Sequence, residues 1–186
     1  DIIITNCEKE HAPSLLAFDR ACILVQLRLD TMGETLELDG QTYNLADHVS
    51  GFDANTVDIE SIDSVLEYEG ITVQCAAPTL KDEVGVNTDV PKVYKTTTDE
   101  NSVSNVFLIE LTKYIETVTF DKNVITFEDL TLKQKIQICE MLPMSLSQQI
   151  VEYIEAIREL ESPFINIAVE DGTSVEIPID SQLFNK

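Results

Sequence analysis

The chain has 186 residues, of which 44% are apolar, so it is long enough to bury a core without help from metals or disulfides. Its 12 basic and 34 acidic residues give a formal net charge of −22. Binding to nucleic acid or to anionic lipid needs clustered lysine and arginine, so this composition argues against both as partners.

The first predicted elements are a short strand at residues 1–5 and a helix within residues 14–33. Apolar residues in the second segment recur every three or four positions, which is typical of a helix with one buried face. Asp19 is a suitable N-cap, and Gly33 can adopt the positive φ that often ends a helix. We expect the buried face to consist of Phe18, Cys22, Val25 and Leu29.

The next part of the chain is predicted to be mainly β. A hairpin is expected at residues 34–45, because Asp39-Gly40 is a dipeptide that favours a type I′ turn. The segment "IDSVLEY" is compatible with a helix or a strand, whereas "ITVQC" has the composition of a strand. From about Thr79 to Asn105 the sequence is polar and unpatterned, which predicts a linker or an arm that orders on a partner.

A helix is predicted at residues 103–116, followed by a hairpin at 117–127 that turns at Asp121-Lys122-Asn123. The apolar spacing of the helix predicts that its buried face contains Val106, Phe107, Leu111 and Ile115.

Two Ser/Thr-x-x-Gln capping boxes predict two further helices, which Pro143 separates. The first box pairs Thr131 with Gln134, and the second pairs Ser145 with Gln148. The apolar stripes of these helices predict a core formed by Leu132, Ile136, Cys139, Leu146, Ile150, Ile154 and Ile157.

The last predicted element is a hairpin at residues 164–179 over Asp171-Gly172. The fold class is therefore α+β, with three to four helices and antiparallel β-hairpins in a small mixed domain. We divide the chain into an N-terminal helix and hairpin region, a polar linker or arm, and a helical pair with a C-terminal hairpin, either as separate parts or as one domain. Their ranges are 1–80, 81–105 and 106–186.

A search for catalytic chemistry finds no convincing constellation. His11 and His48 are the only histidines, and we expect both to be solvated. The sequence from Asp53 begins like an EF-hand loop, but Asp58 replaces the glycine and Ser64 replaces the glutamate that this loop requires. The six glycines are too scattered for a phosphate-binding loop. We predict no catalytic, cofactor-binding or metal-binding residue, no cofactor and no enzymatic activity.

The acidic residues are unevenly distributed. From Leu29 to Leu80 there are eleven carboxylates and no lysine or arginine. The simplest interpretation is a solvated face that keeps the protein soluble. The alternative is a surface matched to a basic protein partner, whose approach such a field would steer.

Other features concern compartment and processing. The four cysteines form no Cys-x-x-Cys pair, and Cys22 and Cys139 lie on apolar helical stripes, so a reducing compartment is expected. No apolar run approaches the ~20 residues of a membrane span, and no signal peptide is evident. Because the sequence begins "DIIIT", we expect residues to precede Asp1.

Two stretches of the sequence resemble a known family. They are "FDRACILVQLRLDTMGETLEL" and the block from "YIETVTFDKNVITFEDL" to "VEIPID". An Asp-Arg helix ending in Thr-Met-Gly, a hairpin, two short helices separated by Leu-Pro and a terminal hairpin are similar to the baseplate proteins of T-even-like contractile-tailed bacteriophages. That family includes a baseplate hub subunit and a hub assembly protein, and the similarity covers about half of the chain.

This resemblance implies a non-enzymatic structural component of the central hub of a phage tail baseplate. Its implied partners are other baseplate and tail hub proteins, with a homo-oligomer in a symmetric assembly as a further expectation. The implied location is the virion, after assembly in the host cytoplasm. Family members often carry Cys-x-x-Cys pairs in the hairpin after the first helix, but "ELDGQTYNLAD" contains no cysteine, so zinc is not implied.

Two alternatives remain open at this point. A baseplate or tail assembly chaperone, absent from the mature virion, would need similar exposed surfaces. An acidic inhibitor that mimics DNA would account for the base-free run from 29 to 80, provided that its carboxylates lie along one exposed stripe.

Overall fold

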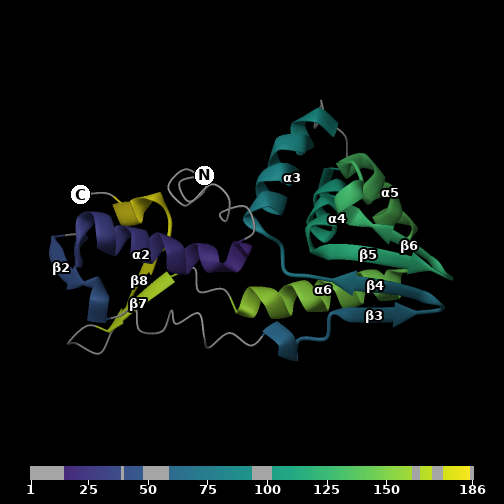
Figure 1. Cartoon of the computed structure of the whole chain (residues 1–186). Helices are drawn as coiled ribbons and strands as arrows, with labels where there is room; N and C mark the ends of the chain where they lie inside the picture. Colours follow the sequence, from purple (N-terminus) through teal and green to yellow (C-terminus); the bar gives the residue numbers. More distant parts are fainter. Residues whose placement is uncertain are drawn as a thin grey trace. The chain divides into compact units, whose positions relative to one another are not determined.

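The computed structural model describes residues 15–38, 40–47, 59–93, 102–160, 164–168 and 174–184. Within these residues, five α-helices and three small antiparallel sheets confirm the predicted α+β class (Figure 1). The chain divides into two compact units, one formed by residues 1–9, 18–58 and 159–186 and the other by 10–17 and 59–158. The first unit thus combines the N-terminal helix with the C-terminal hairpin, which the sequence-based segments kept apart. The predicted strand at 1–5 and both histidines lie outside the described residues.

Among the described residues, the first unit contains one α-helix and two hairpins. Both hairpins occur where the sequence predicts them, and each forms a two-stranded antiparallel sheet. The short 3-10 helices η3 (Leu45–Asp47) and η7 (Ser181–Phe184) complete the unit, and η2 (Ala17–Asp19) begins in the second unit and ends in the first. The main elements are α2 (Arg20–Met32), β1 (Thr35–Leu38), β2 (Gln41–Asn44), β7 (Phe164–Ala168) and β8 (Ser174–Pro178).

The core of the first unit joins residues from both ends of the chain. Val25 of α2 and Leu36 of β1 pack with apolar side chains of the C-terminal hairpin and of η7. Gly33 ends α2 with a φ of +83° and donates its N–H to the Leu29 carbonyl, as the sequence predicts. The buried members of the core are Val25, Leu36, Leu45, Ile165, Ile167, Ile177 and Leu183.

Arg28 is buried in the same unit, with only 3% of its surface exposed. Its guanidinium donates from Nε to the carbonyl of Leu183, from Nη1 to that of Gly33 and from Nη2 to that of Thr35. The fork therefore ties the end of α2 and the start of β1 to η7 near the C-terminus. A buried charge needs such hydrogen bonds, since leaving it unpaired costs several kcal/mol.

The second unit is built around a four-stranded antiparallel sheet with the order β3-β4-β5-β6. Leu66, Val73, Val118 and Ile125 lie opposite one another across all four strands, so one apolar row crosses the inner face of the sheet. The segment "IDSVLEY" thus contains a strand, and "ITVQC" is a strand as predicted. The strands are β3 (Val65–Tyr68), β4 (Ile71–Cys75), β5 (Ile115–Phe120) and β6 (Asn123–Thr126).

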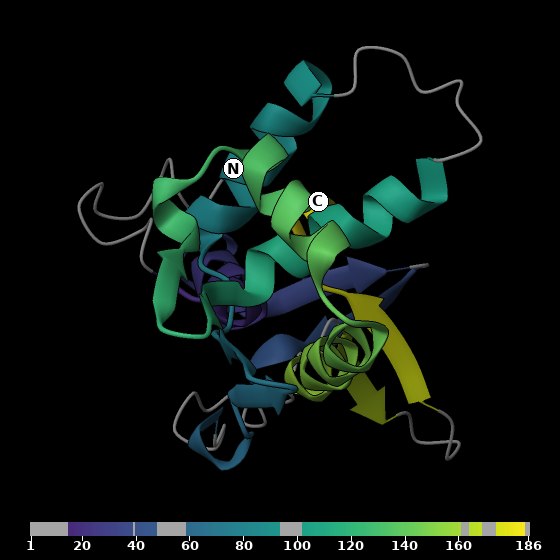
Figure 2. The same ribbon diagram turned by 90° about the vertical axis from the view of Figure 1, so that its right-hand side faces the viewer.

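Four α-helices accompany this sheet in the described part of the second unit. Figures 1 and 2 both show α6 beside β3 and β4. The buried stripe of α6 consists of Leu146, Ile150, Tyr153, Ile154 and Ile157. The other three helices share a separate small core of Val86, Ile109, Leu132 and Ile136. The helices are α3 (Leu80–Val93), α4 (Ser102–Tyr114), α5 (Leu132–Met141) and α6 (Met144–Glu159), with 3-10 helices η5 (Ile59–Ser61) and η6 (Phe127–Asp129).

The prediction of a linker at 81–105 is wrong for residues 81–93, which belong to α3, and for residues 102–105, which begin α4. Gly85, Asn87 and Thr88 are weak helix formers, so the segment lacks an obvious helical pattern. Tertiary packing stabilises α3 where helix propensity is weak, because Leu80 is buried and Val86 belongs to the apolar core that α3 shares with α4 and α5. Residues 94–101 lie outside the described residues.

Two smaller predictions are also corrected. Val106 and Phe107 are 66% and 44% exposed, whereas α4 buries Leu111, as predicted, and Ile109, which was not predicted. The second capping box is wrong because α6 begins at Met144, one residue before the expected cap. The N–H groups of Leu146 and Ser147 both point to the carbonyl of Pro143, which places Ser145 inside the helix. The first capping box, between Thr131 and Gln134, is confirmed in full.

Candidate interaction surfaces

A cleft with a volume of about 500 Å³ opens in the second unit, where α3 begins, α4 ends and η6 leaves the sheet. A smaller pocket of about 190 Å³ adjoins it and extends along α3 and α5. The two hollows form one trough, because both are lined by Lys81, Asp82, Thr112, Lys113, Glu128 and Lys135.

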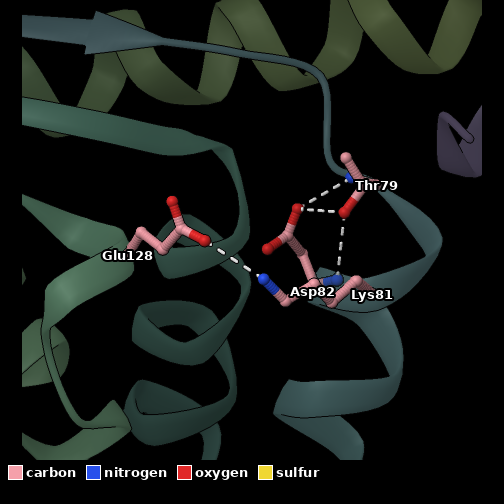
Figure 3. Close-up of polar contacts among 4 residues, drawn as sticks. All are labelled: Thr79, Lys81, Asp82 and Glu128. Atoms are coloured by element: carbon pink, nitrogen blue, oxygen red, sulfur yellow. Dashed lines mark hydrogen bonds and ion pairs between the residues drawn. The ribbon is translucent and has the colours of Figure 1, made fainter. Parts of the chain in front are cut away.

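The start of α3 forms one wall of this trough (Figure 3). Asp82 Oδ2 accepts hydrogen bonds from the N–H of Thr79 at 2.9 Å and from its hydroxyl at 2.6 Å. The hydroxyl of Thr79 in turn accepts the N–H of Asp82 at 3.2 Å. This reciprocal cap provides hydrogen-bond acceptors for N–H groups at the start of α3, and it engages the Asp82 carboxylate in hydrogen bonds. The main chain of Leu15 to Ala17 anchors the same turn, since Leu80 N–H donates to the Leu15 carbonyl.

Lys81 of α3 and Glu128 of η6, which both line the trough, form the ion pair drawn as a dashed line in Figure 3. Lys81 Nζ lies 3.1 Å from Glu128 Oε1, and the two side chains are 65% and 78% exposed. An ion pair this exposed contributes about 0–1 kcal/mol at most, because water and salt screen the attraction. The pair can therefore open at little cost.

A second group of charges lies deeper, at the end of α4. Lys113 Nζ is 2.7 Å from Glu110 Oε2, while Arg158 Nη2 of α6 is 2.8 Å from Glu110 Oε1. One carboxylate thus serves two cations, and the three side chains together carry one net positive charge. Lys113 is mostly shielded from solvent, so this group fixes the position of its ammonium at the trough wall.

Lys135 completes the set of basic residues in the trough. It lies on α5, lines both hollows and has no ion-pair partner among the residues that the structure describes. Three of the chain's 12 basic residues, namely Lys81, Lys113 and Lys135, thus come together from three different helices. Four carboxylates, those of Asp82, Asp89, Glu116 and Glu128, line the same trough, so its wall carries charges of both signs.

The lining of the trough offers charged groups and hydroxyls but no Ser-His or Cys-His pair. No histidine, cysteine or serine lines it. Cys75 and Cys139 are buried elsewhere, and burial raises the pKa of each thiol to about 12, so both stay protonated at neutral pH. In the described ranges, no group of three or more potential ligands is arranged to hold a metal ion.

The outer face of the four-stranded sheet is a second candidate surface. Its outward residues form two rows across the strands, and none of these side chains is buried. Seven of the eight positions are uncharged, and six are β-branched. Val124 on the edge strand β6 is 64% exposed. The rows are Glu67, Thr72, Thr119 and Val124, then Val65, Gln74, Thr117 and Thr126.

The predicted core residues lie in several places. Val25 is buried in the first unit, whereas Phe18, Cys22 and Leu29 are only half-buried. On α5 and α6 the predicted core positions Leu132, Ile136, Cys139, Leu146, Ile150, Ile154 and Ile157 are all buried.

Sequence reasoning missed the lysine-lined trough. Its one local signal was the Thr79-x-x-Asp82 capping pattern, which marks the start of α3.

Comparison with known proteins gives one match. The family model described as "T4 bacteriophage base plate protein" matches residues 1–178, which is nearly the whole chain. The chain belongs to this base plate protein family. No curated protein and no solved structure matches it.

Membership in the base plate family confirms the resemblance at the level of a T4-like phage baseplate protein. The protein therefore has a structural role in the tail baseplate of the virion, where other baseplate proteins are its neighbours. In the part of the chain that the structure describes, no helix combines the length and apolar character needed to cross a membrane.

Proposed function

We propose that this base plate family protein is a permanent component of the central hub of the baseplate and acts only through protein–protein contacts, without catalysis. The observation that carries this proposal is the outer face of the four-stranded sheet. Eight neighbouring side chains from four strands include a single charge, Glu67, although a quarter of the whole chain is charged.

A nearly uncharged β face suits contact with another protein. The centre of protein interfaces is depleted in charged residues, since removing an unpaired charge from water is costly. Threonine and valine side chains are already restricted on a strand, so burying them loses little conformational freedom. The exposed edge strand β6 and the adjoining trough offer further contacts, which is what a subunit with several neighbours requires.

The proposed partners are other baseplate and tail hub proteins, and a homo-oligomer within a symmetric hub is compatible with this role. Assembly would take place in the host cytoplasm before incorporation into the virion. The net charge of −22 disfavours nucleic acid and anionic membranes as partners, because both repel an acidic surface.

The alternatives predict different outcomes. An assembly chaperone absent from the virion would use the same exposed surfaces and leave before completion. A DNA mimic is less well supported, because the described acids between 29 and 80 divide between the two compact units. Asp30, Glu34, Glu37 and Asp47 belong to the first, and Asp63, Glu67 and Glu69 to the second.

Quantitative mass spectrometry of purified particles and of assembly intermediates tests the proposal. We expect stoichiometric recovery in finished particles and, after mild dissociation of the baseplate, in the fraction that contains the central hub. Recovery only in intermediates would support the chaperone, and recovery in a peripheral fraction would reject the hub position. Val124→Lys should lower incorporation, whereas Lys122→Ala, at the exposed turn before β6, should leave it unchanged.

A further inference from the structure

We infer that the first unit opens and closes as one cooperative unit while the second unit stays folded. Opening is the release of the C-terminal segment, formed by β7, β8 and η7, from α2 and the hairpin of β1 and β2. This conformational device is a property of the isolated chain, so it does not depend on the proposed place of the protein in the hub.

The first argument is that the two units have separate apolar cores. Every buried or half-buried member of the first core belongs to residues 18–58 or 159–186. The small core that α3, α4 and α5 share and the buried stripe of α6 belong to residues 59–158. Cores that share no side chain can be lost one at a time, which is the structural condition for unfolding in parts.

The second argument is that the C-terminal segment joins the rest of the first unit without a β-ladder. Strand β1 pairs with β2 and β7 pairs with β8, as two separate two-stranded sheets. Among the described residues, neither β7 nor β8 pairs with β1 or β2. Release of the segment therefore breaks no ladder between strands. The second unit differs, because a continuous four-stranded ladder joins residues 65–75 to residues 115–126.

The third argument is that neither half of the first unit has a core of its own. Val25, Leu36 and Leu45 belong to the N-terminal half, and their other buried partners lie on β7, β8 and η7. Without the C-terminal segment, one helix and isolated hairpins remain, and such elements are marginal in water. Release at one place thus removes the support of all these elements together, which makes the opening cooperative.

Arg28 forms the polar connection between the two halves. Its Nη1 and Nη2 donate to the carbonyls of Gly33 and Thr35, whereas its Nε donates to Leu183 of the C-terminal segment. Release lets water reach the guanidinium, so the charge is not left buried without partners. The bonds to Gly33 and Thr35 are local in sequence, so they can form first and present Nε to the returning Leu183 carbonyl.

The consequence is that a neighbour can control the folding of the first unit. A partner that holds the C-terminal segment against α2 binds the closed form and not the open one, so it stabilises the whole unit. A partner that binds the released α2 has the opposite effect. The second unit stays folded in both states.

Native-state hydrogen exchange of the full chain, measured by NMR at urea concentrations below the unfolding transition, tests the inference. Amides of α2 and of the hairpin β7–β8 should exchange through one shared opening, with the same free energy and the same dependence on urea. Amides of β4 and β5 should exchange through global unfolding and show at least about tenfold greater protection.

Leu183→Ala tests the coupling between the halves. The side chain is fully buried, so the protection of α2 amides should fall about 30-fold or more, although Arg28 of α2 lies 155 positions away. Protection of β4 and β5 should not change. Ile177→Val is a milder variant with an expected loss of about two- to tenfold, in case Leu183→Ala leaves the unit open. Glu176→Gln, at an exposed position of the same strand, is the matched control and should change neither unit.

Ile150→Val makes the reciprocal change, in the buried stripe of α6. It should lower the protection of β4 and β5 about two- to tenfold. The protection of α2 should stay the same, since its amides exchange through the smaller opening.

Three results would overturn the inference. In the first, α2 and β4 exchange through the same opening, which means that the chain unfolds as one unit. In the second, α2 and the hairpin β7–β8 open with different free energies. In the third, Leu183→Ala lowers the protection of β4 and β5 as much as that of α2. The proposed function is tested separately, by recovery of the chain in finished particles.

Discussion

The Nε of Arg28 donates a hydrogen bond of 2.9 Å to the backbone carbonyl of Leu183, a residue 155 positions further along the chain. Together with the bonds to Gly33 and Thr35, it satisfies a buried guanidinium with main-chain carbonyls. The first unit is therefore held by a charged side chain as well as by its apolar core.

Arg28→Met should destabilise the first unit by about 3 kcal/mol, because three carbonyls lose a charged donor. Arg28→Lys should recover only part of this loss, since an ammonium cannot reproduce the planar fork. Urea denaturation followed by circular dichroism measures the change. Arg20→Met, at an exposed position of the same helix, serves as the control, and an equal loss there would contradict the assigned role of Arg28.

Ile154→Asp should prevent stable folding of the second unit. The side chain is almost fully buried on α6, and an unpaired charge there costs several kcal/mol, on the order of the total stability of a domain. Gln148→Asp introduces the same group on the exposed side of α6 and should leave the fold intact. Thermal denaturation compares the two variants. A cooperative transition for Ile154→Asp at the wild-type temperature would contradict the packing described.

The two predicted capping boxes lead to different expectations. Thr131→Ala should lower the free energy of unfolding by about 1 kcal/mol, because its hydroxyl caps α5. Ser145→Ala should have no such cost, because Ser145 lies within α6 rather than at its cap. Chemical denaturation of both variants under identical conditions tests the difference. Equal losses would mean that Ser145 caps α6 after all.

Stability should fall as the pH rises above 9. Burial raises the pKa of Cys75 and Cys139 from 9.0 to about 12, so between these values the thiols ionise in the unfolded chain but not in the folded one. The unfolded state then binds fewer protons, and the free energy of unfolding decreases with pH. The expected loss is about 1 kcal/mol per thiol between pH 9 and 10.

The measurement is urea denaturation at pH 8, 9 and 10, compared with the double variant Cys75→Ala, Cys139→Ala. The double variant should show a smaller decrease over this range, even though its absolute stability is lower. Tyr153, whose pKa burial raises from 10.0 to about 12, adds a loss of the same sign above pH 10, so the comparison stops there. Identical slopes for both proteins would contradict ionisation of the thiols as the cause.

Local sequence patterns predict much of this fold. The hairpin at 34–45, the strand "ITVQC" and the Thr131–Gln134 box were each predicted from such patterns and are observed. They succeed because turn geometry, strand packing and capping depend on neighbouring residues. Helix α3 was missed because its stability depends on Leu80 and Val86 packing against other helices, which its polar composition does not reveal.

The candidate surfaces were less predictable for the same reason. Lys81, Lys113 and Lys135 are far apart in sequence, and only the packing of α3, α4 and α5 brings them to one trough. The outer face of the sheet depends on the strand register, which aligns Thr72 with Thr119 and Val124. Alternation within one strand identifies two faces, but it does not say which face remains uncovered.

The composition of the first unit has a consequence for biosynthesis. Val25, Leu36 and Leu45 find their apolar partners only when residues 165–183 have been translated. At ordinary rates of elongation this delay is on the order of ten seconds, during which α2 has an unprotected hydrophobic face on the nascent chain. The sheet and helices of the second unit come from one nearly continuous stretch of sequence, so they can form before translation of the chain ends. A chaperone that attends the emerging chain would therefore find its binding site on α2.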